Sequence, residues 1–354
     1  MRVAFVAEET AHRREADAAA RTRHLAELLA DRGHDVCVFC VQWWEGTPDA
    51  FEENAVEYRA VTEDPEVSSL RFAARLPAAV ARFDPDVIHG LHTNATITYG
   101  TALAALRGRA PFLLEWYEVA AETGGRSRWN RLAVRLPSRV VVPSKMVQTA
   151  IRELGRAADG ITVVPNSIDM DAIRATDPEP LADIVYSRRL DESANLESLL
   201  LALAELREMD WSAAVIGDGP AREEYEAQTV DLRIDDRVTF VGAQPVDRRI
   251  GIFKGARVYV QTALRTPFAT DLLRALACGC VGIAEYHAAS SAHELVTRRP
   301  RGIVTTGEDE LTAALRQSAD YDRREIDETF AEFDEDRIVD RYLDHYREIG
   351  ATAD

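Results

Sequence analysis

Short apolar runs alternate with amphipathic stretches along most of this chain. The first run, Val3–Val6, precedes a stretch in which Leu25, Leu28 and Leu29 recur at helical spacing. That stretch ends at Gly33, before a second apolar run at residues 36–41. Short apolar runs are typical of buried strands, whereas a three- and four-residue spacing is typical of a helix. The order predicts a β-α-β unit with a glycine stop after its helix.

The same alternation continues into the last third of the chain. Further strand-like runs lie at 56–61, 85–89, 111–116 and 139–143, and then at 184–186, 213–216, 238–241, 258–261, 281–284 and 302–304. Between the two series, a turn-rich and proline-rich stretch from Pro165 to Pro180 is the expected linker. Alternating strands and helices predict an α/β protein with parallel, doubly wound sheets. We expect the end, from about Tyr321 to Ile349, to be helical and charged.

Length and charge narrow the class of protein. With 354 residues, the chain is long enough for two domains with a core each. It carries 60 acidic and 42 basic residues, a net charge of −18, and its only lysines are Lys145 and Lys254. This charge balance favours a halophilic protein, because near-molar salt shortens the Debye length to about 3 Å and so screens the repulsion between the acidic residues. The alternative is an acidic protein from a GC-rich genome that prefers arginine codons. The acidity argues against nucleic acid as a partner.

Segments for targeting, membranes or metals are not expected. No apolar run approaches the roughly 20 residues that span a bilayer, and no signal peptide pattern opens the chain, so we expect a cytoplasmic protein. Two close cysteine pairs, Cys37 with Cys40 and Cys278 with Cys280, raise the possibility of zinc. Because residues three apart on a strand point to opposite faces, we favour inert thiols and no metal.

One segment, Ala263–Gly282, carries a recognisable motif: ALRTPFATDLLRALACGCVG. It resembles the signature of the retaining glycosyltransferases of family 4, in which a Glu-Pro-Phe-Gly loop leads into the helix Leu-Leu-Glu-Ala-Met-Ala-Cys-Gly. The two glutamates of that signature are replaced here by Thr266 and Arg274. Further segments resemble family motifs in the same order: Arg32–Val36, Pro85–His89, Asn166–Asp169, Arg189-Leu190, Ile216–Pro220 and Val241-Gly242.

The resemblance covers essentially the full length and implies the GT-B fold. In that fold, two Rossmann-like, doubly wound parallel-sheet domains face each other across a cleft. We expect an acceptor-side domain at 1–170, a nucleotide-sugar domain at 171–325, and a C-terminal helix at 326–354 that crosses back to the first domain. The resemblance also implies a donor-binding set: Arg189, Arg274, Thr266, Phe268, Gly217, Gly242 and Glu294.

Several members of this set have a second interpretation. Arg189 follows the first strand of the second domain, where it would meet a diphosphate in bidentate fashion or form a surface ion pair. Gly217 and Gly242, like Gly33 and Gly219, also suit tight strand–helix turns. Asn166 and Asp169 would cap and turn the junction. Arg274 either binds phosphate or pairs with Asp271 along one helix.

Other family positions have changed as well. Ala194 stands where the family has the lysine that neutralises the leaving diphosphate, and Tyr117 stands where it has the histidine that faces the sugar. The glycine pair after the first strand is Ala16-Asp17, and the one before Glu294 is Ser290-Ser291. Because transfer depends on stabilising negative charge on the leaving group, these changes bear directly on catalysis and leave the catalytic residues unassigned.

A basic, apolar stretch, Arg126–Leu136, stands out from the acidic chain. It would lay a helix on a lipid surface, or pack Leu132 and Leu136 while its arginines pair with local acids.

Together these features predict a hexosyltransferase that uses a nucleotide sugar as substrate and no cofactor. Its acceptor would be a lipid-linked or surface glycan, for example in S-layer or N-glycan assembly, with peripheral contact to the inner face of the cell membrane as an option. A catalytically inactive GT-B partner of an active transferase is the alternative. A nucleotide-sugar epimerase is disfavoured, because acidic and basic residues for proton abstraction do not stand in recognisable places.

Overall fold

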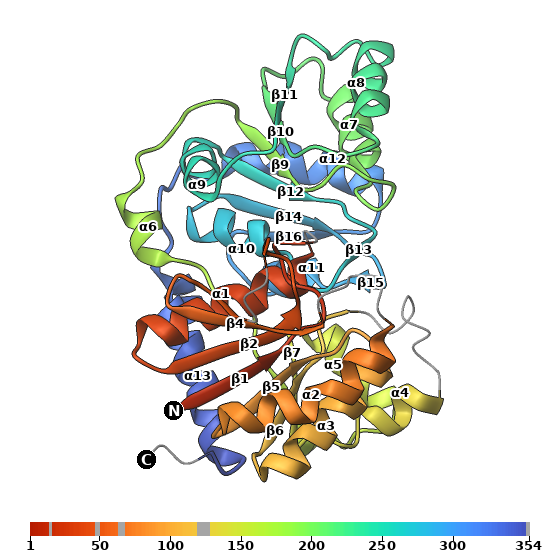
Figure 1. Ribbon diagram of the computed structural model, residues 1–354. Coiled ribbons are helices and arrows are strands. Elements are labelled where there is room, and N and C mark those ends of the chain that lie inside the picture. The colour runs from red at the N-terminus through yellow and green to blue at the C-terminus, as the bar shows by residue number, and fades with distance from the viewer. Residues whose placement is uncertain (14–15, 47–49, 63–67, 119–127, 352–354) are drawn as a thin grey trace. The chain divides into compact units, whose positions relative to one another are not determined.

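The computed structural model describes residues 1–13, 16–46, 50–62, 68–118 and 128–351. It divides the chain into two compact units. Unit 1 comprises residues 1–166 together with 336–354, and unit 2 comprises residues 167–335. Each unit is a Rossmann-like α/β domain built around its own parallel sheet (Figure 1). The predicted fold class is thereby confirmed.

Unit 1 contains an eight-stranded sheet in the order β3-β4-β2-β1-β5-β6-β7-β8. The pairs are parallel except for β3 with β4, which form an antiparallel hairpin. The strands are β1 (Arg2–Val6), β2 (Asp35–Val41), β3 (Ala50–Glu53), β4 (Val56–Thr62), β5 (Val87–Leu91), β6 (Phe112–Glu115), β7 (Arg139–Val142) and β8 (Ile161–Val163). Strand order reverses between β1 and β5, as in doubly wound sheets.

Helices cover both faces of this sheet. They are α1 (Asp17–Asp31), α2 (Ser69–Phe83), α3 (Ala95–Gly108), α4 (Arg128–Ala133), α5 (Lys145–Glu153) and α13 (Glu335–Glu348), with a 3₁₀ turn, η1, at Ala158–Gly160. Alternate strand residues feed two core clusters, one shared with α2, α3 and α5 and the other with α1 and α13. Cys37 belongs to the first cluster and Cys40 to the second, so the two thiols face opposite sides as predicted. All four cysteines are buried and free.

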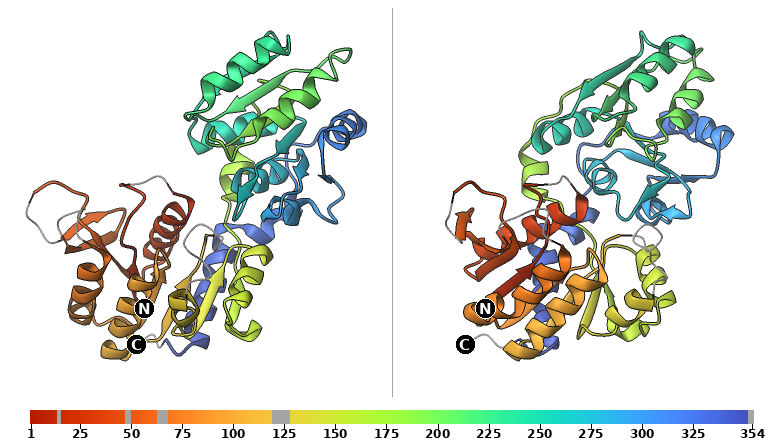
Figure 2. Two further views of the ribbon diagram at one scale, coloured as in Figure 1. Left: turned by 90° about the vertical axis from the view of Figure 1, so that its right-hand side faces the viewer. Right: turned by 45° about the vertical axis from the view of Figure 1, so that its right-hand side comes forward.

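The C-terminal helix α13 completes unit 1. Its residues Ile338, Val339, Tyr342, Leu343 and Tyr346 are buried in the same cluster as α1. At the surface, Arg32 at the end of α1 pairs with Asp336 and Asp340, both at 2.7 Å. The blue helix can be followed among the red-to-yellow elements of unit 1 in Figure 2.

Unit 2 contains a six-stranded parallel sheet in the order β11-β10-β9-β12-β14-β16, plus a two-stranded ribbon, β13-β15. Its strands are β9 (Ile184–Ser187), β10 (Ala213–Ile216), β11 (Val238–Gly242), β12 (Val258–Gln261), β13 (Arg265–Thr266), β14 (Val281–Glu285), β15 (Ala289–Ser290) and β16 (Gly302–Thr305). The order reverses between β9 and β12, the strands that flank the topological switch point of this sheet.

The unit 2 sheet is also covered on both faces. Its helices are α6 (Met170–Ala175), α7 (Leu196–Ala204), α8 (Arg222–Asp231), α9 (Val246–Gly255), α10 (Thr270–Ala277), α11 (Ala292–Val296) and α12 (Glu308–Gln317), with 3₁₀ turns η2 (Ser318–Asp320) and η3 (Glu328–Phe333). Helices α7, α8 and α12 share one apolar cluster with the strands, while α10 and α11 contact β12, β14 and β16. At the junction, the Asp169 carboxylate accepts from the Ala172 N–H at 2.7 Å and caps α6.

The structure also corrects two expectations. The helical end does not begin at Tyr321, because residues 321–327 form no helix and regular structure resumes only with η3 and α13. The basic stretch is shorter as a helix than its composition indicated: α4 spans Arg128–Ala133, and residues 126–127 lie outside the described residues. Among the described residues, no helix is long and apolar enough to cross a membrane.

Candidate functional site

In open parallel sheets, ligands bind outside the carboxyl ends of the strands at the switch point. In unit 2 that point lies between β9 and β12. Strand β9 ends at Ser187 and is followed by Arg188 and Arg189, and β12 is followed by Thr262. This carboxyl edge is therefore the candidate site of unit 2.

Two glycines allow the turn after β10 to approach the chain that leaves β9. Gly217 has a φ of +134° and Gly219 a φ of +157°, so both lie in the region that favours glycine. A Cβ on Gly217 would stand 1.8 Å from the carbonyl oxygen of Arg188, and one on Gly219 would stand 2.2 Å from that of Leu190. The Gly217 N–H donates to the Gly242 carbonyl oxygen at 2.9 Å. These glycines shape the arginine segment by backbone packing.

Two adjacent arginines follow β9 at this edge. Arg188 is half-buried and donates to the Ser193 hydroxyl at 2.8 Å, while its buried Nε–H has no hydrogen-bond partner among the described residues. Arg189 is exposed, and no ion pair or hydrogen bond holds its side chain within the part of the chain that the structure describes. Both guanidinium groups retain N–H donors for an anion.

A third group brings helices α9 and α10 to the end of β9. Asp271 accepts from the Ser187 hydroxyl at 2.6 Å and from Arg274 at 2.8 Å, and it also pairs with Arg249. Burial alone would raise the pKa of Asp271, but the neighbouring charges of Arg249 and Arg274 lower it overall. The predicted Asp271–Arg274 helix pair is therefore present. Because one carboxylate serves two arginines, the cluster carries an excess positive charge.

The other predicted donor residues lie nearby on the chain but differ in exposure. Thr266 is buried on β13, and its carbonyl oxygen accepts from the Ser291 N–H at 2.9 Å. Phe268 is buried, whereas Glu294 is half-buried on α11. The Ser291 hydroxyl donates to the Pro267 carbonyl oxygen at 2.6 Å, which ties the start of α11 to the loop before α10.

Sequence reasoning missed three charged residues of this edge, Arg188, Arg249 and Glu285, and predicted Asp271 only as the helix partner of Arg274. Arg188 and Glu285 stand at the ends of strands β9 and β14, so their position directly at a strand end was an available signal. Arg249 lies on helix α9, and only its tertiary contact with Asp271 reveals it. The contact of Asp271 with Ser187 likewise depends on the tertiary structure.

The positions of the family's lysine and histidine are buried. Ala194 is fully buried, and its carbonyl oxygen accepts from the Tyr186 hydroxyl at 2.6 Å. Tyr117 is buried in unit 1, and its hydroxyl accepts from the Asn166 amide at 3.0 Å. Burial raises the pKa of Tyr117 well above its usual value, so the phenol stays neutral. Neither side chain offers a charge to a departing diphosphate.

Unit 1 contains a buried charge cluster in the middle of β5 and at the end of β6. Arg21 pairs with Glu115, and both side chains are almost fully buried. Glu115 also bonds to His89 at 3.0 Å and to the Tyr342 hydroxyl at 3.2 Å, and His89 bonds to the Tyr346 hydroxyl at 2.7 Å. Arg21 further contacts Asn166 and donates to the Val164 carbonyl oxygen at 2.7 Å. We call Arg21, His89, Glu115, Tyr342 and Tyr346 the unit 1 cluster.

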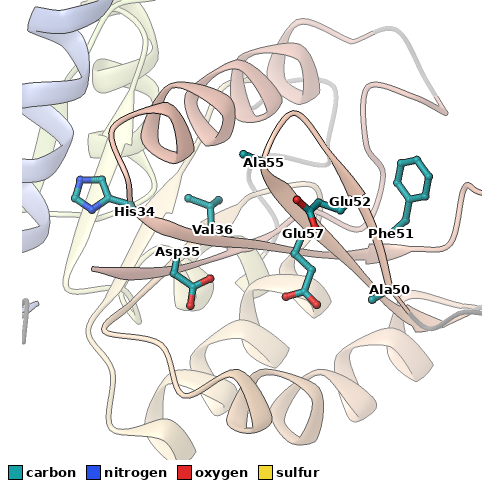
Figure 3. Close-up of a pocket in the computed structure, with 8 residues that line it drawn as sticks. All are labelled: His34, Asp35, Val36, Ala50, Phe51, Glu52, Ala55 and Glu57. Atoms are coloured by element: carbon teal, nitrogen blue, oxygen red, sulfur yellow. The ribbon is translucent and has the colours of Figure 1, made fainter.

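A cavity of 490 Å³ lies elsewhere in unit 1 (Figure 3). It is lined by His34, Asp35, Val36, Ala50, Phe51, Glu52, Ala55 and Glu57. Asp35 opens β2, so the cavity lies at the amino end of that strand. Ligands of doubly wound sheets bind at the opposite end, so this cavity is not the donor site.

Comparison with known proteins agrees with the fold. Residues 18–167 match a family described as glycosyl transferase 4-like domain, and residues 171–324 match glycosyl transferases group 1. The chain is 25% identical over 166 residues to 2-deoxystreptamine glucosyltransferase from Streptomyces kanamyceticus, an alignment that covers 42% of this chain and 43% of that protein.

Solved structures of similar fold include sucrose-phosphate synthase from Thermosynechococcus elongatus, with 18% identity, a TM-score of 0.78 and 99% of each chain covered. HepE from Anabaena in complex with UDP-glucose has 18% identity and a TM-score of 0.77, with 98% of this chain and all of that chain covered. A glycosyltransferase from Rickettsia africae has 15% identity and a TM-score of 0.79, with 99% of each chain covered. With the two glycosyltransferase models matched in succession on this fold, the chain belongs to the glycosyltransferases of the GT-B fold.

Proposed function

We propose that this protein transfers a hexose from a nucleotide-sugar donor to a lipid-linked or surface-glycan acceptor, for example in S-layer or N-glycan assembly. The arginines at the carboxyl edge of unit 2 support the donor half of the proposal. HepE, which has the same fold, was solved with UDP-glucose. Donor cleavage places negative charge on the diphosphate, and N–H donors already in place stabilise that charge without reorganisation.

The observation that carries the acceptor half is an exposed apolar surface on two helices of unit 1. Helices α3 and α4 lie side by side, and the Tyr99 hydroxyl of α3 donates to the Trp129 carbonyl oxygen of α4 at 2.8 Å (Figure 1). Leu103 and Leu106 follow Tyr99 at helical spacing, and Leu106 is 76% exposed. Trp129 is 53% exposed, as predicted for a surface helix. The α3/α4 surface comprises Leu103, Leu106, Trp129, Leu132 and Leu136.

Basic residues frame this surface in an otherwise acidic chain. Arg107, Arg128, Arg131 and Arg135 are all exposed. The Arg128 guanidinium carbon lies 4.9 Å from the centre of the Trp129 ring, so charge and apolar area are adjacent. Leucine and tryptophan beside arginine are typical of a surface that lies in a lipid headgroup region. The proposed localisation is therefore cytoplasmic with peripheral membrane contact, and a lipid-linked acceptor would be reached from that surface.

Vesicle co-sedimentation tests the surface. Replacing Arg128, Arg131 and Arg135 with glutamate should abolish binding to vesicles of anionic phospholipid while leaving the melting temperature nearly unchanged. Replacing Arg233, Arg298 and Arg316 with glutamate makes the same change in charge on exposed residues of unit 2, and it should leave vesicle binding intact. Equal vesicle binding by both triple variants would refute the membrane contact. Near-molar salt should weaken the electrostatic part of the interaction.

Transfer itself is tested with labelled nucleotide sugars and extracted lipids. We expect label to move into the lipid fraction for at least one nucleotide sugar, and to stay in the aqueous fraction when Arg189 is replaced by alanine. Label that enters only water-soluble glycans would refute a lipid-linked acceptor.

A second candidate function is that of an inactive partner of an active transferase. It is favoured by the loss of charge at Ala194 and Tyr117, both of which are buried. This function predicts that nucleotide diphosphates bind but that no nucleotide sugar is turned over. Turnover of any donor by the isolated protein would exclude it.

A further inference from the structure

Glu285 stands at the carboxyl end of β14, one strand beyond the switch point of unit 2. We propose that its carboxylate accepts hydrogen bonds from hydroxyl groups of the donor and so replaces the carboxylates that are missing at Thr266 and Arg274. The inference rests on the proposed function, because it assigns a residue to the same nucleotide-sugar site.

The first argument is the burial of an unneutralised carboxylate. The Glu285 side chain is 8% exposed. Within the described part of the chain, neither arginine nor lysine pairs with it, and its partners are the Asn195 amide at 3.2 Å and His287 Nε2 at 3.5 Å. Burying a carboxylate without a permanent cation is costly. If Glu285 only supported the fold, a neutral side chain would support it at a lower cost of burial. A role in binding a ligand accounts for a carboxylate at this position.

The second argument is the way in which this carboxylate is held. Both contacts reach the same oxygen, Oε2, so Oε1 has no hydrogen bond to the described residues. Asn195 has a left-handed backbone, with φ 51°, and its amide also donates to the Thr262 carbonyl oxygen at 3.0 Å. The Thr262 hydroxyl returns a bond to the Asn195 carbonyl oxygen at 2.6 Å. Asn195 thus fixes the carboxylate between the ends of β12 and β14 and leaves one oxygen available.

The third argument is position relative to the arginines. The ends of β9, β12 and β14 are neighbours in the sheet. Since adjacent strands are about 4.8 Å apart, the chain that leaves β9 lies roughly 10 Å from Glu285 along the sheet edge. A nucleoside diphosphate sugar has its anionic phosphates and its hydroxyl-bearing rings separated on this scale. Arg188, Arg189 and Arg274 would take the phosphates, and Glu285 would take ribose or sugar hydroxyls.

Calorimetric titration of the full chain with UDP, UDP-glucose and pyrophosphate tests the assignment. Glu285→Gln keeps the size of the side chain and an oxygen for Asn195, but it removes the charge. We expect at least a tenfold weaker affinity for UDP or UDP-glucose and an unchanged affinity for pyrophosphate, which has no hydroxyl-bearing ring. Glu205→Gln, an exposed residue at the end of α7, makes the same charge change and should alter none of the three affinities.

The probes also separate the two sources of hydroxyl groups. If UDP binding falls and 2′,3′-dideoxyuridine diphosphate binding does not, Glu285 contacts the ribose. If only UDP-glucose binding falls, Glu285 contacts the sugar. Melting curves confirm that Glu285→Gln is folded, and Glu285→Asp, which keeps the charge on a shorter side chain, should bind UDP-glucose more tightly than Glu285→Gln.

The proposed function and the inference fail in different ways. Absence of binding of UDP and UDP-glucose by the unaltered protein would overturn the donor assignment and the inference with it. Binding by the unaltered protein that survives Glu285→Gln would overturn the inference alone. An equal loss of pyrophosphate and UDP affinity would show that Glu285 only holds Asn195 and the fold of the edge.

Discussion

The two units each place arginine beside a buried carboxylate, but the two clusters differ in how well their charges are buried and paired. In the unit 1 cluster, the side chains of Arg21 and Glu115 are 7% and 0% exposed, and His89 and two tyrosines complete the hydrogen bonds. In unit 2, Arg249, Arg274 and Asp271 are 22%, 19% and 12% exposed. There, two cations share one anion, and in the described part of the chain the Arg249 Nε–H has no hydrogen-bond partner.

The difference separates a cluster whose charges are paired within the fold from one that keeps excess positive charge and unused N–H donors. In a buried ion pair, each charged group is held by its partner and by further hydrogen bonds. Removing one partner leaves the other charge buried and unpaired, which lowers the free energy of unfolding. A cluster with excess charge and unused donors gains most when an anion arrives. Changes in unit 1 should therefore act on stability, and changes in unit 2 on binding.

The largest expected effect is the replacement of Arg21 by methionine. It leaves Glu115 buried without its cation, and the free energy of unfolding should fall by about 3–5 kcal/mol. Chemical denaturation measures this loss. Arg23→Met, on the exposed side of the same helix, should cost less than about 1 kcal/mol. A similar cost for both variants would show that the unit 1 cluster does not stabilise the fold more than a surface pair.

The pH dependence of stability should come next. Burial opposes ionisation of Glu115, but Arg21 and His89 outweigh it and lower its pKa from 4.5 to about 2. The pair's contribution is therefore complete above pH 4.5 and is lost as pH falls toward 2, on the order of 2–3 kcal/mol. Burial lowers the pKa of His92 to about 3, which adds a loss below pH 6.5.

Comparison with Glu115→Gln separates these two contributions. Denaturation of both proteins between pH 5 and pH 3 should give a flatter pH dependence for the variant. An identical slope would mean that the Glu115 carboxyl is not held ionised by Arg21.

In unit 2, Arg274→Glu restores the family's residue and should nevertheless weaken nucleotide binding. The new carboxylate would face Asp271 and the donor phosphates, with no lysine at Ala194 to offset it. We expect about a tenfold loss of UDP affinity by calorimetry, near 1.4 kcal/mol. Arg316→Glu, an exposed change on α12, is the matched control. Unchanged or tighter binding in Arg274→Glu would make Arg274 only the ion-pair partner of Asp271.

The smallest predicted effect applies to both units at once. The net charge of −18 repels itself when unscreened, so the melting temperature should rise between about 0.1 M and molar KCl. For roughly 1 kcal/mol of relieved repulsion, the rise is about 2–4 °C. A melting temperature and far-UV spectrum that do not change with salt would remove the halophilic interpretation.

The fold was predictable because strand runs and helical spacing report burial directly. Ten of the predicted runs after Val41 correspond to β4 to β7, β9 to β12, β14 and β16, within a few residues at their ends. The elements that were missed are β3, β8, β13 and β15, which have two to four residues each. Such short segments pair through tertiary context, and their own sequence carries little signal.

The site was predictable only in outline. The family-like motifs predicted Thr266, Arg274 and Arg189 as donor residues, and the structure adds that Arg274 pairs with Asp271. Arg249 gave no pattern, because its partner Asp271 lies 22 residues away. Glu285 stands at a strand end, but the residue that holds its carboxylate, Asn195, lies 90 residues away. Ion pairs and buried amides depend on three-dimensional proximity, which a linear pattern does not encode.

Helix α13 has a consequence for how the protein is made. Glu115 and its partner Tyr342 are separated by 227 residues, and every residue of unit 2 is synthesised in between. At about 5–20 residues per second, the ribosome needs roughly 10–45 s to cover that distance. During this interval unit 2, which is continuous in sequence, can form its own core, while the sheet of unit 1 still lacks the helix that covers α1. The first domain to emerge is therefore the last to be completed, and a nascent chain stalled before residue 336 should be more sensitive to protease in unit 1 than in unit 2.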